Sequence, residues 1–242
     1  MSKSKRRFSR PRHATVAAIL GALNAPFLDR NQCYFGGGTR IVLALDEYRE
    51  SADIDFLCSS REGYRSLRST INNRSLGEIA AGKVTLAREV VADRYGIRTF
   101  IDVGGQKIKF EIVNEGRIDV SGNKQRDLHV PCLDERSCFA EKLLANADRW
   151  DDESFLSRDV IDLAYMIEGW GMELFIKGGR VAHAAYGDAV ETSARAAARK
   201  LLDKKDYFKK CVDGLRVTNV NTFVTGLKRI AARGWSCKLP GQ

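Results

Sequence analysis

The hydrophobic pattern changes its period near Pro131, and this change is the strongest constraint on what the chain can fold into. Before Pro131, apolar and polar residues alternate, as in half-buried strands, in segments 53–58, 83–90, 97–103 and 107–113. After it, apolar residues recur at helical spacing in 134–149, 158–169, 188–206 and 218–233. We therefore predict an α+β protein, in which an α/β first half is followed by a helical C-terminal bundle.

Local signals divide the chain further. Residues 1–12 carry six Lys or Arg and predict a basic disordered arm. Residues 13–29 have the apolar spacing of a helix, and the glycine pair 104–105 predicts a hairpin turn. We expect an α/β domain over 13–130 and a helical domain over 131–242.

Composition and charge exclude several classes of protein. No run of about 18 apolar residues occurs, so we expect no membrane span. The basic N-terminus lacks the apolar core of a secretory signal, and we expect a cytoplasmic protein. Six cysteines form no C-x-x-C pair and three histidines lie far apart, which favours free buried thiols over disulfides or a zinc site. The net charge of +9 favours anionic partners such as NTP or RNA.

Two carboxylates on one predicted strand are the main candidates for catalysis. Asp53 and Asp55 are two residues apart, so their side chains point to the same face of the strand. Like charges held this close repel each other, and a divalent cation such as Mg²⁺, which prefers carboxylate oxygens and substrate phosphates, removes that cost. A lone D-x-D is more often a pair of surface acids, so the assignment needs support from elsewhere in the chain.

A glycine-rich turn upstream gives that support. The run 36–38 is all glycine and is followed by Thr39 at a predicted strand-to-helix junction. Glycines let backbone N–H groups approach a phosphate closely, and a helix N-terminus favours an anion. The alternative is a plain turn in which Thr39 caps the helix.

A third carboxylate, Glu111, lies on the polar face of the predicted strand 107–113. If this strand lies next to the one that carries Asp53 and Asp55, Glu111 joins them as a metal ligand. The alternative is an exposed acid that pairs with Lys109.

These motifs occur in an order that resembles the polymerase-beta nucleotidyltransferase superfamily, and within it the AbiEii-type nucleotidyltransferase toxins. Residues 37–56 are similar to their first motif, GGT…R-x-S-x-D-I-D-F. Residues 141–145 (E-K-L-L-A) and 158–163 (R-D-V-I-D-L) are similar to the later E-K-L-x-A and R-D-x-x-D-L motifs. The connection between Thr39 and Asp53 is about one residue longer than in the family pattern, and Glu111 stands where Asp is common.

The resemblance implies a polymerase-beta-like core with a mixed sheet, and a helical domain that completes the active site. It implies Mg²⁺ or Mn²⁺ as cofactor and NTP as substrate. The predicted metal ligands are Asp53, Asp55 and Glu111. The predicted catalytic residues are these three together with Lys142, Asp159 and Asp162. The predicted nucleotide-binding residues are Gly37, Gly38, Thr39, Ser51, Lys142, Arg149 and Arg158.

The residue types of the second half agree with these roles. Lys142 is a compact cation suited to a triphosphate, and Arg149 follows two helical turns later on the same face. Asp159 and Asp162 share a face of the next predicted helix, where one acid can orient a cation or accept a proton. The alternatives are a solvated charge at Lys142 and an interhelical ion pair at Asp162.

We therefore predict an NTP-dependent nucleotidyltransferase that acts on RNA, with tRNA as the expected acceptor. The family resemblance implies the toxin of a toxin–antitoxin or phage-defence system, with an antitoxin protein as a possible partner. Two alternatives stay open: nucleotide transfer to a protein or small molecule, and a non-catalytic module that binds nucleotide or RNA.

Overall fold

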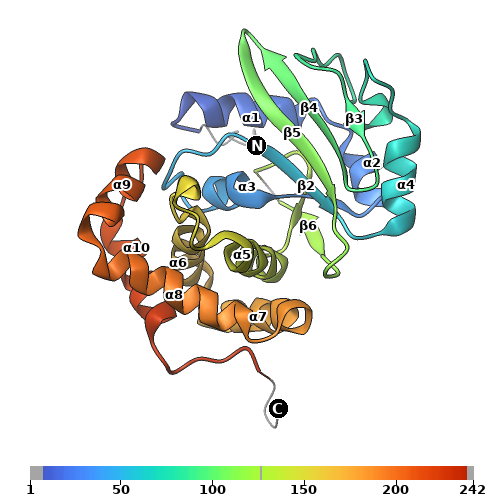
Figure 1. Ribbon diagram of the computed structural model, residues 1–242. Helices are drawn as coiled ribbons and strands as arrows, with labels where there is room; N and C mark the ends of the chain where they lie inside the picture. The colour runs from blue at the N-terminus through green and yellow to red at the C-terminus, as the bar shows by residue number, and fades with distance from the viewer. Residues whose placement is uncertain (1–7, 126, 239–242) are drawn as a thin grey trace, which may run out of the picture. The chain divides into compact units, whose positions relative to one another are not determined.

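The computed structural model describes residues 8–125 and 127–238 (Figure 1). By its contacts the chain forms two compact units. The sheet unit contains the described residues up to Leu43 together with Ser51–Asp134, and the helical unit contains Ala44–Glu50 and the described residues from Glu135 onward. The sequence pattern places the change of structure near Pro131, and it gives no sign that the short segment Ala44–Glu50 belongs with the helices.

The described part of the sheet unit is built on a seven-stranded mixed sheet with the order β3-β4-β5-β2-β1-β7-β6. The strands are β1 Cys33–Gly36, β2 Ile54–Cys58, β3 Val91–Ala92, β4 Gly96–Val103, β5 Gln106–Asn114, β6 Gly122–Lys124 and β7 Pro131–Leu133. The β2–β5 and β1–β7 pairs are parallel, and the other neighbours are antiparallel. The prediction of an α+β fold with a mixed sheet is confirmed.

The β4–β5 hairpin shows how local sequence sets the register. Gly104 and Gly105 have φ values of 60° and 84°, a conformation that glycine adopts without steric cost. The predicted turn is therefore present, and it pairs Val103 with Gln106.

Helices supply the rest of the sheet unit's core. They are α1 Pro11–Gly21, α2 Ala25–Arg30, α3 Gly37–Ala44 and α4 Arg61–Ser69, with a 3₁₀ turn at Gly77–Ile79. Leu20 of α1, Leu28 of α2 and Leu67 of α4 are buried in one cluster with alternate residues of β2 and β5, such as Phe56 and Phe110. Alternation along the strands thus leaves one set of side chains in the core and the other set available for a site.

Two sequence-based predictions in this unit need correction. Residues 83–90 do not form a strand: they contact β4 through an isolated bridge at Leu86, because the chain bends at Ala87 and Arg88 and interrupts the ladder. The helix predicted over 13–29 is two helices, α1 and α2, because Asn24 caps the second by accepting a hydrogen bond from the Phe27 N–H at 3.2 Å.

The predicted arm at 1–12 falls only partly on described residues. Residues 1–7 lie outside them. Phe8 is buried in the core of the sheet unit, and α1 begins at Pro11, a residue suited to the first turn of a helix.

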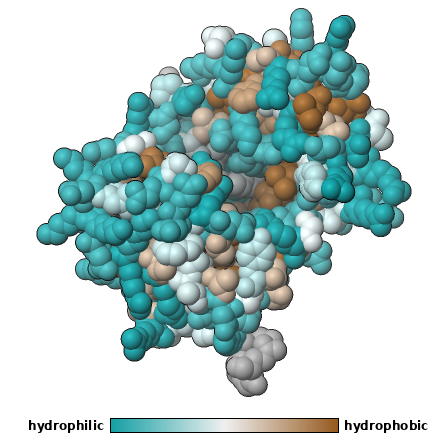
Figure 2. Space-filling model, viewed as in Figure 1, coloured by the Kyte–Doolittle hydropathy of each residue, from teal (hydrophilic) through white to brown (hydrophobic). Residues whose placement is uncertain are grey.

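The helical unit contains the helices α5 Glu135–Arg149, α6 Arg158–Trp170, α7 Met172–Tyr186, α8 Ala189–Asp203, α9 Lys205–Leu215 and α10 Val220–Ala231, with a 3₁₀ turn at Glu153–Phe155. The stretch predicted as one helix over 188–206 ends at Asp203, and α9 follows at once. The visible surface of α8 and α9 is mostly hydrophilic (Figure 2), as expected for amphipathic helices. Among the described helices, none combines the length and apolar content needed to cross a bilayer.

Close helix packing in this unit predicts a strong effect of one methyl group. A Cβ atom at Gly226 of α10 would lie 2.3 Å from the backbone oxygen of Ala164 in α6. Because backbone cannot move aside as a flexible side chain can, we expect Gly226→Ala to lower the free energy of unfolding by about 1–3 kcal/mol. Urea unfolding followed by circular dichroism measures this.

The matched control is Gly21→Ala at the end of α1, where a new Cβ meets nothing within 4 Å. There the higher helix propensity of alanine should leave stability unchanged or slightly increased. Equal effects of the two substitutions would contradict the close approach of α6 and α10.

Candidate active site

The sheet brings together two of the predicted carboxylates. β2 and β5 are parallel, and their register sets Asp55 directly beside Glu111. Side chains at paired positions of neighbouring strands lie on the same face of a sheet. The Asp55 and Glu111 side chains are 27% and 18% exposed, so both are partly shielded yet accessible. Asp53 lies just before β2 and is exposed.

The glycine turn lies against this pair of carboxylates. β1 ends at Gly36, which pairs with Asp55 across the antiparallel β1–β2 ladder. Gly37 follows with φ of 67°, and a Cβ atom there would lie 2.5 Å from Oδ2 of Asp55. Only glycine fits this position, for both its backbone conformation and its space. The N-terminus of α3 therefore begins directly beside the Asp55 carboxylate.

Two hydroxyl groups brace the same turn. The Thr39 and Ser51 hydroxyls are 2.8 Å apart, and Thr39 is fully buried. The Ser51 N–H donates to Nε2 of His13 at 3.3 Å, and His13 is also buried. Sequence reasoning missed His13, because a lone histidine on an apolar helix carries no signal of its partner.

Lys109 supplies the positive charge nearest to the carboxylates. Its Nζ atom donates to Glu111 and lies 4.0 Å from Oδ1 of Asp55. Burial alone would lower the pKa of Lys109, but the hydrogen bond to Glu111 and the charges of Asp55 and Glu111 outweigh burial, so this pKa is raised. The alternative pairing of Glu111 with Lys109 is thus present, and it coexists with the Asp55–Glu111 pair.

The donor set fits a divalent cation in its chemistry. Two adjacent carboxylates, with a third on the residue before β2, are the oxygen ligands that Mg²⁺ and Mn²⁺ prefer. Lys109 contacts both carboxylates, and its positive charge offsets the repulsion between Asp55 and Glu111. Within residues 8–125 and 127–238, no three His, Cys, Asp or Glu side chains converge as a ready metal cluster.

The predicted residues of the helical unit form a buried charge cluster. The Asp162 carboxylate has no solvent exposure and accepts from the Tyr48 hydroxyl at 2.6 Å. It also accepts from Nε and Nη2 of Arg49 at 2.7 and 2.8 Å, and it lies 2.8 Å from Nζ of Lys142. One carboxylate therefore holds three donors, two of them cationic.

Asp159 extends this cluster along α6. It accepts from Nζ of Lys142 at 2.8 Å and from Nε of Arg149 at 2.7 Å. Burial acts to raise the pKa of Asp159 and of Asp162, but the cations facing them outweigh burial and hold both pKa values below the ordinary range. These two acids are therefore ionised ion-pair partners at neutral pH.

Arg158 lies apart from these ion pairs. Its guanidinium is 5.2 Å from the ring centroid of Phe155, and Arg149 stacks on the same ring at 4.5 Å. The structure thus groups four of the predicted residues, Lys142, Arg149, Asp159 and Asp162, and adds Tyr48 and Arg49. Sequence reasoning assigned no role to Tyr48 or Arg49, because their partner lies more than a hundred positions away.

Comparison with known proteins shows the family of the chain. The family described as "Nucleotidyl transferase AbiEii toxin, Type IV TA system" matches residues 18–215, which contain both the carboxylate pair and the buried charge cluster. The chain belongs to the AbiEii family. It is accordingly a nucleotidyltransferase that uses NTP, and its family is that of type IV toxin–antitoxin toxins.

Two solved structures share the fold of this AbiEii-family chain. A protein from H. pylori described as a candidate nucleotidyltransferase has a TM-score of 0.53 at 15% identity, over 96% of this chain and 94% of that one. JHP933 from Helicobacter pylori has a TM-score of 0.52 at 15% identity, over 93% and 94%. Among curated proteins, none matches. The resemblance inferred from the motifs is confirmed.

The buried charge cluster predicts an acid dependence of stability. Asp159 and Asp162 have folded-state pKa values below the value of about 3.9 of an unfolded Asp. Their stabilisation is therefore complete above that value and is lost as the pH falls toward the folded-state pKa. We expect the free energy of unfolding, measured in urea, to change little from this cluster between pH 7 and about pH 5 and to fall from there toward pH 2.

The variant Asp162→Asn isolates the contribution of the cluster. It leaves Arg49 and Lys142 buried without their shared anion, so we expect a loss of about 3–5 kcal/mol at pH 7 and a smaller further loss on acidification. Asp203→Asn, an exposed acid at the end of α8, is the control and should keep the wild-type pH profile. A D162N profile parallel to that of the wild type would show that the cluster does not set the acid dependence.

Proposed function

We propose that this AbiEii-family enzyme moves a nucleotide from an NTP to RNA, with a divalent metal ion held by Asp53, Asp55 and Glu111. One observation carries the proposal: the register pairs Asp55 with Glu111 on the same face, and Gly37 lies against Asp55 so closely that no side chain fits. Carboxylates for a cation and a glycine turn for phosphate thus lie next to each other.

The turn suits the phosphates of an NTP. The N-terminus of α3 presents backbone N–H groups at Gly37 and Gly38, and it carries the positive end of the helix dipole. Thr39 and Ser51 hold each other at 2.8 Å, so we assign them to fixing the turn and the approach to β2. A metal ion at the carboxylates would neutralise charge on the phosphates as the leaving group departs.

In the proposed reaction an acceptor hydroxyl forms a bond to the α-phosphorus of the NTP. The bond from that phosphorus to the pyrophosphate breaks, and the hydroxyl proton passes to a base. Asp53 is the exposed carboxylate of the three, and we propose that it is the one that contacts the acceptor hydroxyl. Lys109 contacts both Asp55 and Glu111, and it would have to leave these ion pairs for the carboxylates to hold a cation.

Among the cations of the helical unit, exposure separates two roles. Arg149 is 29% exposed and Arg158 is half-buried, so both have surface with which to bind a phosphate. Lys142 is 8% exposed, and its ammonium contacts both Asp159 and Asp162. We propose that Lys142, Asp159 and Asp162 position Arg149 and Arg49, and that they act on catalysis through those residues.

The charge of the chain supports RNA as acceptor. A net charge of +9 favours a polyanion over a neutral small molecule, and tRNA is the expected acceptor. The family also implies an antitoxin protein, which we expect to reduce transfer when it is present.

The transfer assay tests the activity directly. The purified protein is incubated with each α-labelled NTP, Mg²⁺ and either total RNA, protein or small-molecule acceptors. We expect labelled RNA with the wild type, and a loss of at least about 100-fold with Asp55→Asn or Glu111→Gln, because the charge that organises the transition state is gone.

Glu78→Gln is the control, because Glu78 is an exposed acid of the same unit outside the site. It should keep full activity. Full activity in Asp53→Asn and Asp55→Asn would end the site assignment, and label found only on protein or small molecules would replace RNA as the acceptor.

Binding of the metal alone gives a separate test that does not depend on turnover. At tenfold or greater excess over Kd, Mn²⁺ without NTP should raise the Tm of the wild type by roughly 2–6 °C, because the ion binds only the folded site. The Asp55→Asn protein should lose most of this shift and the Glu78→Gln protein should keep it. An equal shift in all three proteins would place the bound ion elsewhere.

A further inference from the structure

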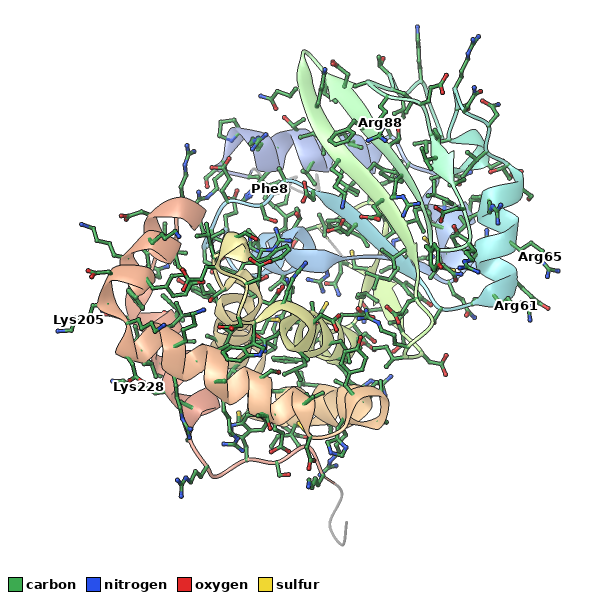
Figure 3. The ribbon with its side chains drawn as sticks, viewed as in Figure 1. Phe8, Arg61, Arg65, Arg88, Lys205 and Lys228 are labelled. Carbon is green, nitrogen blue, oxygen red and sulfur yellow. The ribbon has the colours of Figure 1, made fainter. Side chains whose placement is uncertain are left out.

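The sheet unit contains a cavity lined by arginines that is separate from the carboxylate pair. A cavity of about 500 Å³ is lined by Arg61, Arg65, Arg68 and Arg94, together with Tyr64 and Asn114. We call it the arginine pocket. Figure 3 shows Arg61 and Arg65 extending outward from α4.

Three of these arginines share one face of α4. Arg61 and Arg65 are four residues apart and Arg68 follows three later, so their guanidiniums neighbour one another. Like charges at these spacings destabilise a helix. In the part of the chain that the structure describes, none of the three has an ion-pair partner, and all are exposed. This uncompensated charge suits an anionic ligand.

Asp93, the acid of the turn that carries Arg94, does not neutralise the pocket. The Asp93 carboxylate accepts from the backbone N–H groups of Tyr95 and Gly96 at 2.7 and 3.1 Å, and it pairs with Arg98. These contacts fix the turn before β4. The turn thus presents Arg94 to the pocket and keeps its own carboxylate engaged.

An exposed aromatic ring lies against one of the pocket's arginines. Tyr95 is 61% exposed, and the Arg94 guanidinium lies over its ring at 4.6 Å. The wall is held by the Tyr64 hydroxyl, which donates to the Asp93 carbonyl at 2.6 Å, and by Asn114, whose side chain donates to the Arg94 carbonyl at 2.8 Å. Proteins bind single-stranded nucleic acid with guanidiniums, which contact phosphates, and with exposed aromatic rings, which stack on bases. Both elements are present here.

The pocket lies near the end of the strand that carries Glu111. Asn114 is three residues beyond Glu111 on β5, which corresponds to about 10 Å at the rise of a strand. The odd separation sets these two side chains on opposite faces of the strand, and α4 packs on the core face. An RNA strand bound in the pocket therefore reaches the carboxylates only around the end of the sheet.

We propose that the arginine pocket binds the phosphodiester backbone of the acceptor RNA, with Tyr95 stacking on an unpaired base. The inference rests on the proposed transfer to RNA and names the surface that holds this acceptor. Arginine forks match phosphate geometry, and the open Tyr95 ring favours a nucleic acid over an acidic protein segment.

Binding by a catalytically inactive protein tests the pocket apart from the chemistry. Fluorescence anisotropy with a labelled single-stranded RNA is measured in the Asp55→Asn background, alone and with Arg65→Ala and Arg68→Ala combined. We expect the double substitution to weaken binding at least about tenfold. It should also reduce the slope of log K against log salt concentration by roughly 1.4, since two phosphate contacts are lost.

The control is Arg88→Ala, which removes one positive charge from an exposed position of the same unit outside the pocket (Figure 3). It should leave affinity close to that of the parent. Tyr95→Ala should weaken RNA binding about tenfold, and Tyr95→Phe should restore it, because stacking needs the ring and not the hydroxyl.

Each other outcome overturns the proposal in a defined way. Equal affinity of the Arg65/Arg68 double variant and the Arg88 control would show that the pocket does not hold RNA. Displacement of the RNA by polyglutamate or by free NTP as readily as by unlabelled RNA would make the pocket a general anion or nucleotide site. Failure of the transfer assay, in contrast, would leave these binding curves unchanged and would count against the proposed reaction alone.

Discussion

The helical unit depends on the interactions of one buried carboxylate, that of Asp162. It is inaccessible to solvent and ionised, so it is tolerated only because Tyr48, Arg49 and Lys142 surround it with donors. Two of these donors lie on the short segment Ala44–Glu50, and the next residue is Ser51, which bonds Thr39 in the glycine turn. Asp162 of the R-D-x-x-D-L motif therefore anchors the segment that immediately precedes Ser51 in the chain.

The carboxylate pair depends on a different kind of constraint, which is strand register. A shift of one residue between β2 and β5 would set Asp55 beside an apolar core residue instead of Glu111. The alternation of buried residues along both strands excludes that shift, since Phe56 and Phe110 must stay in the core. The position of Asp55 in turn requires glycine at position 37, because the turn passes too close to Asp55 for a side chain. Lys109 completes the group as a built-in counter-charge.

The sequence predicted the parts of this arrangement that rest on local pattern. Asp55 and the glycine turn follow from periodicity and from the backbone freedom of glycine, and the α+β division follows from the change of period. The neighbour of β2 could not be deduced, because parallel pairing is a tertiary choice, so the place of Glu111 stayed conditional. Arg49 stands in the first family motif, but its role was not predicted because its partner is remote in sequence. The strand predicted over residues 83–90 was wrong, because alternating apolar and polar residues indicate partial burial, and an irregular segment at the edge of a sheet is also partly buried.

The separation between Arg49 and its partner has a consequence for biogenesis. The ribosome makes Arg49 113 residues before Asp162, and during that interval the guanidinium has no buried anion to meet. Strands β1 and β2 flank the segment Ala44–Glu50. The nascent chain can therefore pair these strands before the segment between them has Asp162 to contact. Contacts of such high sequence separation form slowly. The segment that joins the glycine turn to the Asp55 strand therefore gains its buried anion only after α6 has been synthesised.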